Sequence, residues 1–115
     1  VLNTSVEELA SAGILKIEGG FNDIESKGII EIVNALLDKD LVNLIMNFKD
    51  CSEINNYGVS VLISLIGAIN EKEGKLVFTN ISNDMEKKFN MMGIASYVKF
   101  FDDDVSALKS FDDNF

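Results

Sequence analysis

Apolar residues along this chain change repeatedly between the spacing typical of strands and the spacing typical of helices. The alternation in residues 14–19 (ILKIEG) predicts a strand, and Gly19 and Gly20 predict a turn after it. The nearly continuous apolar run of residues 41–48 (LVNLIMNF) predicts a central strand that is covered on both faces and has a parallel neighbour. Three further short strands are expected at residues 4–9, 74–81 and 97–101.

Helical spacing fills the segments between these strands. Residues 22–39 predict a helix that is capped by Asn22 or Asp23, with Glu25 placed to complete a capping box. Residues 57–73 predict a second helix, in which Val59 and Ile63 lie outside the main apolar stripe and are expected to form an exposed apolar patch.

Two more helices are expected in the second half of the chain. Residues 82–93 predict a helix that packs Met92 into the core and stops at Gly93. The tail, residues 102–111, predicts a closing helix with Val105, Leu108 and Phe111 facing inward. Strands and helices that alternate in this way predict an α/β layer fold, and because the 115 residues contain no proline and no linker we expect one domain, residues 1–115.

Composition narrows the range of functions. The net charge of -9 disfavours a nucleic-acid partner, because phosphate backbones repel an acidic surface. The chain has no histidine, which excludes imidazole general bases, histidine-containing triads and the usual zinc sites, and no phosphate-binding glycine loop is present. Asp102, Asp103 and Asp104 are interpreted as a solvated helix start rather than a metal site. We therefore expect no enzymatic activity, no cofactor and no metal.

The same reasoning predicts a cytoplasmic protein with no membrane association. No apolar run reaches the roughly eighteen residues that a membrane helix needs, and the first residues lack the layout of a signal peptide. The single cysteine, Cys51, has no partner for an internal disulfide and no histidine to activate it, so we expect an unreactive thiol.

The segment INNYGVSVL, residues 54–62, joins the central strand to the second helix. Asn55 and Asn56 stand at this junction, where an asparagine side chain is a good helix cap because its oxygen accepts a hydrogen bond from a free backbone N–H. A cap explains their presence in structural terms, but it leaves open whether these amides also replace a reactive group.

The order and spacing of these motifs resemble the STAS domain, a family named after sulphate transporters and anti-sigma factor antagonists. The resemblance is strongest in LVNLIMNFKDCSEINNYGVSVL, residues 41–62, and continues through residues 74–108. It implies a STAS-type fold: a mixed, mostly parallel sheet of four to five strands with about four helices. It also implies transcription regulation in a bacterium, through binding of an anti-sigma factor with a kinase fold.

In well-studied members of the family this partner phosphorylates a serine that follows an aspartate. The resemblance places that aspartate on Asn55 and the phosphoacceptor serine on Asn56. An amide cannot accept a phosphoryl group, so we expect a module that binds constitutively, with Ser52 or Ser60 as possible alternative acceptors. The partner surface that we expect consists of Asn55, Asn56, Tyr57, Gly58, Val59, Ser60 and Ile63.

Two further expectations concern assembly. The chain is expected to be a monomer or a weak homodimer. The alternative function is that of a STAS subunit in a stress-signalling or lipid-transport complex, which would also act by binding proteins.

Overall fold

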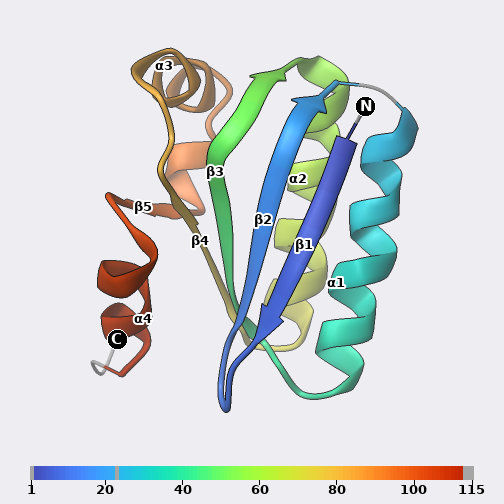
Figure 1. Cartoon of the computed structure of the whole chain (residues 1–115), viewed down its shortest axis with the longest axis vertical. Coiled ribbons are helices and arrows are strands. Elements are labelled where there is room, and N and C mark those ends of the chain that lie inside the picture. Colours follow the sequence, from blue (N-terminus) through green and yellow to red (C-terminus); the bar gives the residue numbers. More distant parts are fainter. Residues whose placement is uncertain (1, 23, 113–115) are drawn as a thin grey trace.

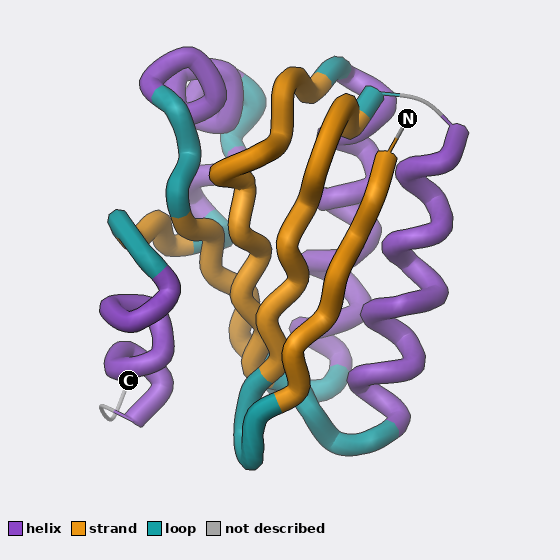
Figure 2. Tube along the Cα trace, viewed as in Figure 1, coloured by secondary structure: helices purple, strands orange, loops and turns teal. Residues whose placement is uncertain are grey.

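The strands of the protein form one sheet. The structure is a computed structural model, and it describes residues 2–22 and 24–112. Within those ranges the strands are β1 (Leu2–Glu8), β2 (Gly13–Phe21), β3 (Asn43–Ile54), β4 (Lys75–Thr79) and β5 (Lys99–Phe101). They lie in the order β1-β2-β3-β4-β5; β1 is antiparallel to β2 and all other neighbours are parallel (Figures 1 and 2).

Helices cover the sheet. The described α-helices are α1 (Gly28–Asp38), α2 (Asn56–Glu71), α3 (Asn83–Met91) and α4 (Asp104–Asp112). α1 and α2 each connect adjacent parallel strands, and such crossovers place their helices on the same face when the strands are added in one direction. Figure 1 shows α1 and α2 side by side behind the sheet. The prediction of a mixed, mostly parallel α/β sheet is confirmed.

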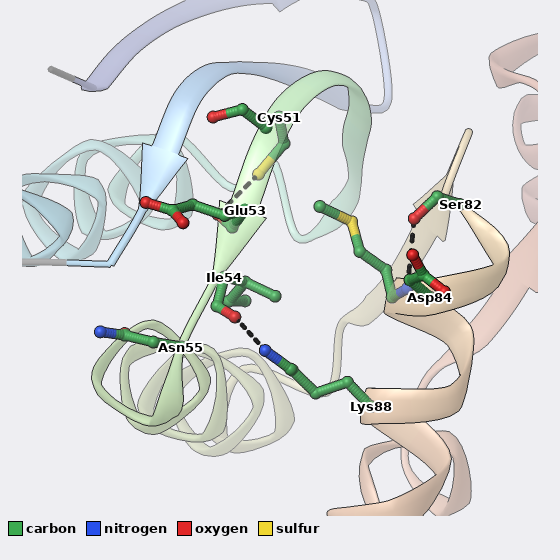
Figure 3. Close-up of a pocket in the computed structure, with 9 residues that line it drawn as sticks. Cys51, Glu53, Ile54, Asn55, Ser82, Asp84 and Lys88 are labelled. Atoms are coloured by element: carbon green, nitrogen blue, oxygen red, sulfur yellow. Dashed lines mark hydrogen bonds between the residues drawn. The ribbon is translucent and has the colours of Figure 1, made fainter.

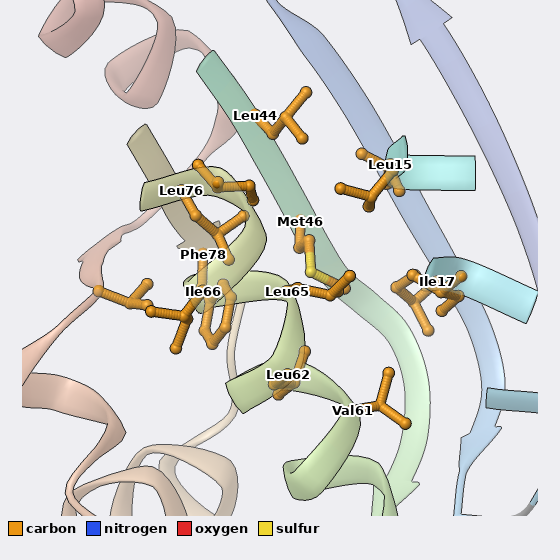
Figure 4. Packing of buried hydrophobic residues seen from close by; sticks show 14 of the residues in the cluster. Leu15, Ile17, Leu44, Met46, Val61, Leu62, Leu65, Ile66, Leu76 and Phe78 are labelled. Carbon is orange, nitrogen blue, oxygen red and sulfur yellow. The ribbon is translucent and has the colours of Figure 1, made fainter. Parts of the chain in front are cut away.

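The main core lies between the sheet and the helices α1, α2 and α3. Side chains alternate along each strand, so alternate residues of β2, of β4 and of the first half of β3 point into this core. Figure 4 shows these residues packed against the apolar stripe of α2. Full burial of one such side chain stabilises the fold by roughly 1.5–3 kcal/mol. The residues are Leu15, Ile17, Leu44, Met46, Leu76 and Phe78 from the strands and Val61, Leu62, Leu65 and Ile66 from α2.

Aromatic rings hold α3 beside the sheet. Phe89 of α3 has its ring centroid 5.9 Å from that of Phe48 and 5.3 Å from that of Phe78. Phe48 and Phe78 meet edge to face at 5.0 Å. Aromatic pairs in such orientations contribute about 0.5–1.5 kcal/mol beyond their buried area. α3 is therefore anchored next to the part of β3 that leads to α2.

The second face of the sheet carries α4 and a smaller cluster. Ile14, Ile45, Val77 and Ala107 form its buried part. A polar network lies beside it: Asp104 accepts a hydrogen bond from Asn47 Nδ2 at 3.0 Å and one from Thr79 Oγ1 at 2.6 Å. Because β3 has helices on both faces over this region, the prediction of a central strand covered on both sides is confirmed.

Several local predictions about packing are wrong. Met92 is 39% exposed, because it is the C-cap of α3 and Gly93, at φ 78°, turns the chain there. Val105 is 62% exposed, because α4 contacts the sheet through Ala107. Leu108 and Phe111 do face inward as predicted, since both are half-buried and pack against the cluster around Ala107.

The predictions around the first helix also need correction. Gly19 and Gly20 belong to β2, where Gly19 has φ 91° and the register with β3 shifts, so the glycines accommodate a bulge rather than a turn. α1 begins at Gly28, after a short 3-10 turn (Ile24–Lys27), and has no side-chain cap. Asp23 lies outside the described residues, and Asn22 donates to the Glu53 carboxylate instead of capping a helix.

Candidate functional site

The junction between β3 and α2 is built around Asn55. Asn55 is the N-cap of α2, with extended backbone at φ -116° and ψ -173°, and its Oδ1 accepts from the Gly58 N–H at 3.0 Å. Its Nδ2 donates to the carbonyl oxygen of Asn22 at 2.8 Å. One amide side chain therefore caps the helix and ties it to the end of β2, which confirms the capping role predicted for this segment.

Gly58 allows the helix to approach β2 closely. A Cβ atom at this position would lie 2.6 Å from Phe21 Cδ1 and 2.9 Å from Ile54 Cγ1, and it would overlap the Phe21 carbonyl oxygen. No other residue type fits without a shift of backbone, so the first turn of α2 rests directly on Phe21. This contact sets the position of Asn56 relative to the sheet.

The exposed side of α2, over its first two turns, carries three of the predicted surface residues. Asn56 is the first residue of α2, and Asn56, Ser60 and Ile63 follow one another at helical spacing. All three are exposed, and the apolar side chain of Ile63 is 54% exposed. They form a continuous stripe along α2 that faces solvent.

Three other predicted residues are placed differently. Val59 is 3% exposed, so its predicted contribution to an exposed apolar patch is wrong; it packs into the main core because the close contact at Gly58 tilts this turn onto the sheet. Gly58 is buried as well. Tyr57 is half-buried, and its hydroxyl oxygen has no hydrogen-bond partner within the described part of the chain.

The residues just before the junction belong to the strand. Ser52, one of the two alternative acceptors, lies in β3, where it is exposed. Cys51 is half-buried, and its thiol donates to the Glu53 carbonyl oxygen at 3.4 Å. Burial raises the pKa of the Cys51 thiol, which agrees with the expectation that it is unreactive.

A groove separates the C-terminal part of β3 from α3 (Figure 3). It has a volume of about 460 Å³. Lys88 of α3 crosses one end, and its ammonium group donates to the Ile54 carbonyl oxygen. Ser82 caps α3 by accepting from the Met85 N–H at 3.2 Å. The lining residues are Cys51, Ser52, Glu53, Ile54, Asn55, Ser82, Asp84, Met85 and Lys88.

Sequence reasoning did not find this groove. The Ser82 cap is visible in the sequence, but Lys88 and Ile54 are 34 positions apart and nothing in the local pattern pairs them. The prediction of a solvated helix start holds for Asp103, which accepts from the Ser106 N–H at 2.8 Å at the start of α4; this backbone hydrogen bond lowers the pKa of its carboxyl group. It is wrong for Asp104, which is half-buried and accepts from Asn47 and Thr79 of the sheet. Among residues 2–22 and 24–112 no group of three or more His, Cys, Asp or Glu side chains is placed to hold a metal ion.

Replacing Asn55 by alanine tests the capping geometry. We expect Asn55→Ala to lower the free energy of unfolding by about 1 kcal/mol, because the Gly58 N–H loses its acceptor. Urea denaturation followed by circular dichroism measures the change. Asn34→Ala, at an exposed position inside α1, is the control and should leave stability unchanged or slightly higher. An Asn55→Ala loss no larger than that of the control would contradict this role.

Within residues 2–22 and 24–112, no helix is both long and apolar enough to cross a membrane.

Known structures with similar folds agree with this architecture. An anti-sigma factor antagonist from Mycobacterium paratuberculosis superposes with a TM-score of 0.85 at 12% identity, covering 98% of this chain and 96% of that chain. The anti-sigma factor antagonist SpoIIAA in its unphosphorylated form gives 0.72 at 17% identity, with 96% of each chain covered. The phosphorylated form of the Bacillus protein gives 0.74 at 16% identity, covering 95% of this chain and 99% of that one.

At identities this low, the TM-scores establish a shared fold and nothing more specific. The family is established by sequence, because the profile of the STAS domain matches residues 3–107, which is nearly the whole chain and includes the β3–α2 junction. The chain belongs to the STAS domain family.

Proposed function

We propose that this STAS domain is a protein-binding module whose partner is an anti-sigma factor with a kinase fold, and that it contacts this partner through the N-terminal side of α2. The observation that carries the proposal is the exposed stripe of Asn56, Ser60 and Ile63 on a helix whose start is held rigidly by Asn55 and Gly58. The stripe joins two polar side chains to one exposed apolar side chain, and the mixture of polar and apolar area that it offers is that of an ordinary protein contact surface. Asn55 and Tyr57 complete the surface, while Gly58 and Val59 support it from below.

Binding at this surface is not switched by phosphorylation of Asn56. A phosphate adds about -1.5 to -2 charges, which in an acidic protein would oppose association by repulsion and desolvation. The amide of Asn56 has no hydroxyl to accept it. The Ser60 hydroxyl donates to the Tyr57 carbonyl oxygen at 2.6 Å, which is a structural role within the helix, and Ser52 lies back in β3. We propose that the module is non-catalytic and binds constitutively.

A charge at position 56 tests the surface. Tagged wild-type domain, Asn56→Asp and Asn34→Asp are used to capture proteins from a lysate of the source organism, and the affinity of the captured partner is measured for each. We expect Asn56→Asp to bind at least about tenfold more weakly, because a new carboxylate that the partner covers must lose its water without gaining a partner charge. Asn34→Asp makes the same change on the exposed side of α1 and should bind like the wild type.

The design separates binding from folding. Aspartate in the first turn of a helix is favourable, so Asn56→Asp should unfold at or above the temperature of the wild type. The intact mass of the recovered wild-type domain is recorded at the same time. Capture of transporter or stress-complex subunits instead of a kinase-fold protein would refute the partner, and a domain that returns one phosphate heavier would refute constitutive binding.

A further inference from the structure

Of the two edges of the sheet, the one formed by β1 is long and open. β1 pairs with β2 in an unbroken register on one side, and within the described structure no strand lies on its other side (Figures 1 and 2). β5, at the opposite edge, has only 3 residues. Exposed edges are usually protected by proline, lysine or a bulge, and β1 contains none of these. Its edge is therefore able to pair with a further strand.

The backbone groups of every second residue of β1 point away from β2. The Leu9 N–H donates to the Ala12 carbonyl oxygen at 2.8 Å, so these two residues form a hydrogen-bonded pair at the turn between the strands. Bonded and non-bonded pairs alternate along an antiparallel ladder, and the register of β1 with β2 then fixes which residues are not bonded to β2. The residues whose N–H and C=O groups face outward are Leu2, Thr4, Val6 and Glu8.

Side chains from the region of α1 reach the two ends of this edge. The Glu25 carboxylate accepts from the Leu2 N–H at 3.4 Å, and Lys39 donates to the Glu8 carboxylate at 3.0 Å. Between these ends Val6 is 40% exposed, although β-branched residues in strands gain their stability from packing against cross-strand neighbours. The middle of β1 thus combines outward backbone groups with an apolar side chain that is incompletely covered.

We propose that this edge binds a second copy of the chain, with the two β1 strands antiparallel about a twofold axis at Ser5. This register pairs all 7 residues of the strand, whereas any other antiparallel twofold register pairs fewer. The outward backbone groups of Thr4 then lie opposite those of Val6 in the second copy, so donors meet acceptors in both directions. Each copy uses the same surface, as in other twofold dimers.

The side chains of β1 also match in this register. Asn3 lies opposite Glu7 of the second copy, so an amide donor meets a carboxylate. Thr4 lies opposite Val6, which gives the exposed valine a β-branched neighbour. Neither glutamate faces another carboxylate, because Glu8 lies opposite Leu2. Parallel pairing in register would instead place each glutamate opposite itself, which is destabilising.

The strength of the dimer follows from charge and size. The net charge of -9 on each copy opposes association, and a contact between two short strands is small. We therefore expect a reversible dimer whose dissociation constant falls as salt screens the repulsion. Analytical ultracentrifugation of the whole chain over a range of protein and salt concentrations measures this constant. A chain that stays monomeric up to its limit of solubility would overturn the proposal.

A cysteine on the twofold axis tests the register. Ser5→Cys, in a Cys51→Ser background, places two thiols in a non-bonded pair with Cα atoms about 4.5 Å apart, a distance that a disulfide spans. Oxidation with diamide should give a disulfide-linked dimer, which intact mass detects. Glu7→Cys in the same background is the control, because its two copies lie roughly 13 Å apart along the strands. Equal cross-linking of both variants, or none with Ser5→Cys, would overturn the register.

Charge variants test the same pairing without cross-linking. Asn3→Lys should tighten the dimer about two- to fivefold, because the new ammonium groups face the Glu7 carboxylates, and Asn3→Glu should weaken it by a similar factor. Asn90→Lys and Asn90→Glu change the net charge equally at an exposed position of α3 and should have smaller effects. Equal effects at both positions would refute the pairing of β1. No partner of α2 is present in these experiments, so their results are independent of those for Asn56→Asp.

Discussion

Gly58→Ala should lower the free energy of unfolding by about 3 kcal/mol, at the upper end of the range for overpacked sites, because the new methyl group has nowhere to go. It would lie 2.6 Å from a ring carbon of Phe21 and 2.9 Å from a side-chain carbon of Ile54, and the nearest atom of all is the Phe21 carbonyl oxygen, which belongs to backbone. Flexible side chains can move aside, but a backbone carbonyl at the end of β2 cannot move without disturbing the sheet. Chemical denaturation of both proteins measures the difference.

A second glycine in the same helix provides the matched control. Gly67 is exposed, and a Cβ atom there would meet no other atom within 4 Å. Gly67→Ala should therefore stabilise the protein by up to about 1 kcal/mol, the ordinary preference of a helix interior for alanine. If both substitutions stabilise, the close approach of α2 to β2 is not as tight as the structure shows. Gly58→Ala should also weaken partner binding, because the new methyl group pushes the start of α2 away from Phe21 and so displaces Asn56.

Asp104→Ala should lower the free energy of unfolding by about 2–3 kcal/mol, because two buried donors lose their acceptor. Asn47 and Thr79 are 8% and 0% exposed, and both donate to the Asp104 carboxylate. Leaving buried donors unsatisfied costs more than the hydrogen bonds themselves contribute. Loss of this network should also loosen α4, which amide hydrogen exchange of residues 104–112 measures directly.

Two further substitutions make this prediction specific. Asp104→Asn retains one acceptor oxygen for two donors, so its free energy of unfolding should lie between those of the wild type and Asp104→Ala. Asp102→Ala removes a neighbouring exposed carboxylate outside the network and should change stability by less than about 0.5 kcal/mol. Equal losses for Asp102→Ala and Asp104→Ala would point to the charge of the helix start, rather than to hydrogen bonds with the sheet.

The candidate site was predictable to the extent that local chemistry defines it. An asparagine before an apolar helical pattern is a cap wherever the helix packs, so Asn55 was identified correctly and Asn56 was placed at the exposed helix start. The burial of Val59 could not be predicted in the same way. Whether a residue beside the main stripe is covered depends on how closely its helix approaches the sheet, and the contact of Gly58 with Phe21 decides that.

The sequence by itself determined the order of strands and helices, the central position of β3 and the α/β class. The spacing of apolar residues shows which side of each helix or strand is buried. This spacing is the same whichever element packs against that side, so it can be read without knowing the tertiary structure. Tertiary structure decided the rest: β4 stops pairing at Thr79 while β3 continues to Ile54, and α3 is held beside this edge by Phe89. The groove and the Asp104 network arise from residues far apart in the chain, whose distances depend on pairing register and helix packing rather than on any local pattern.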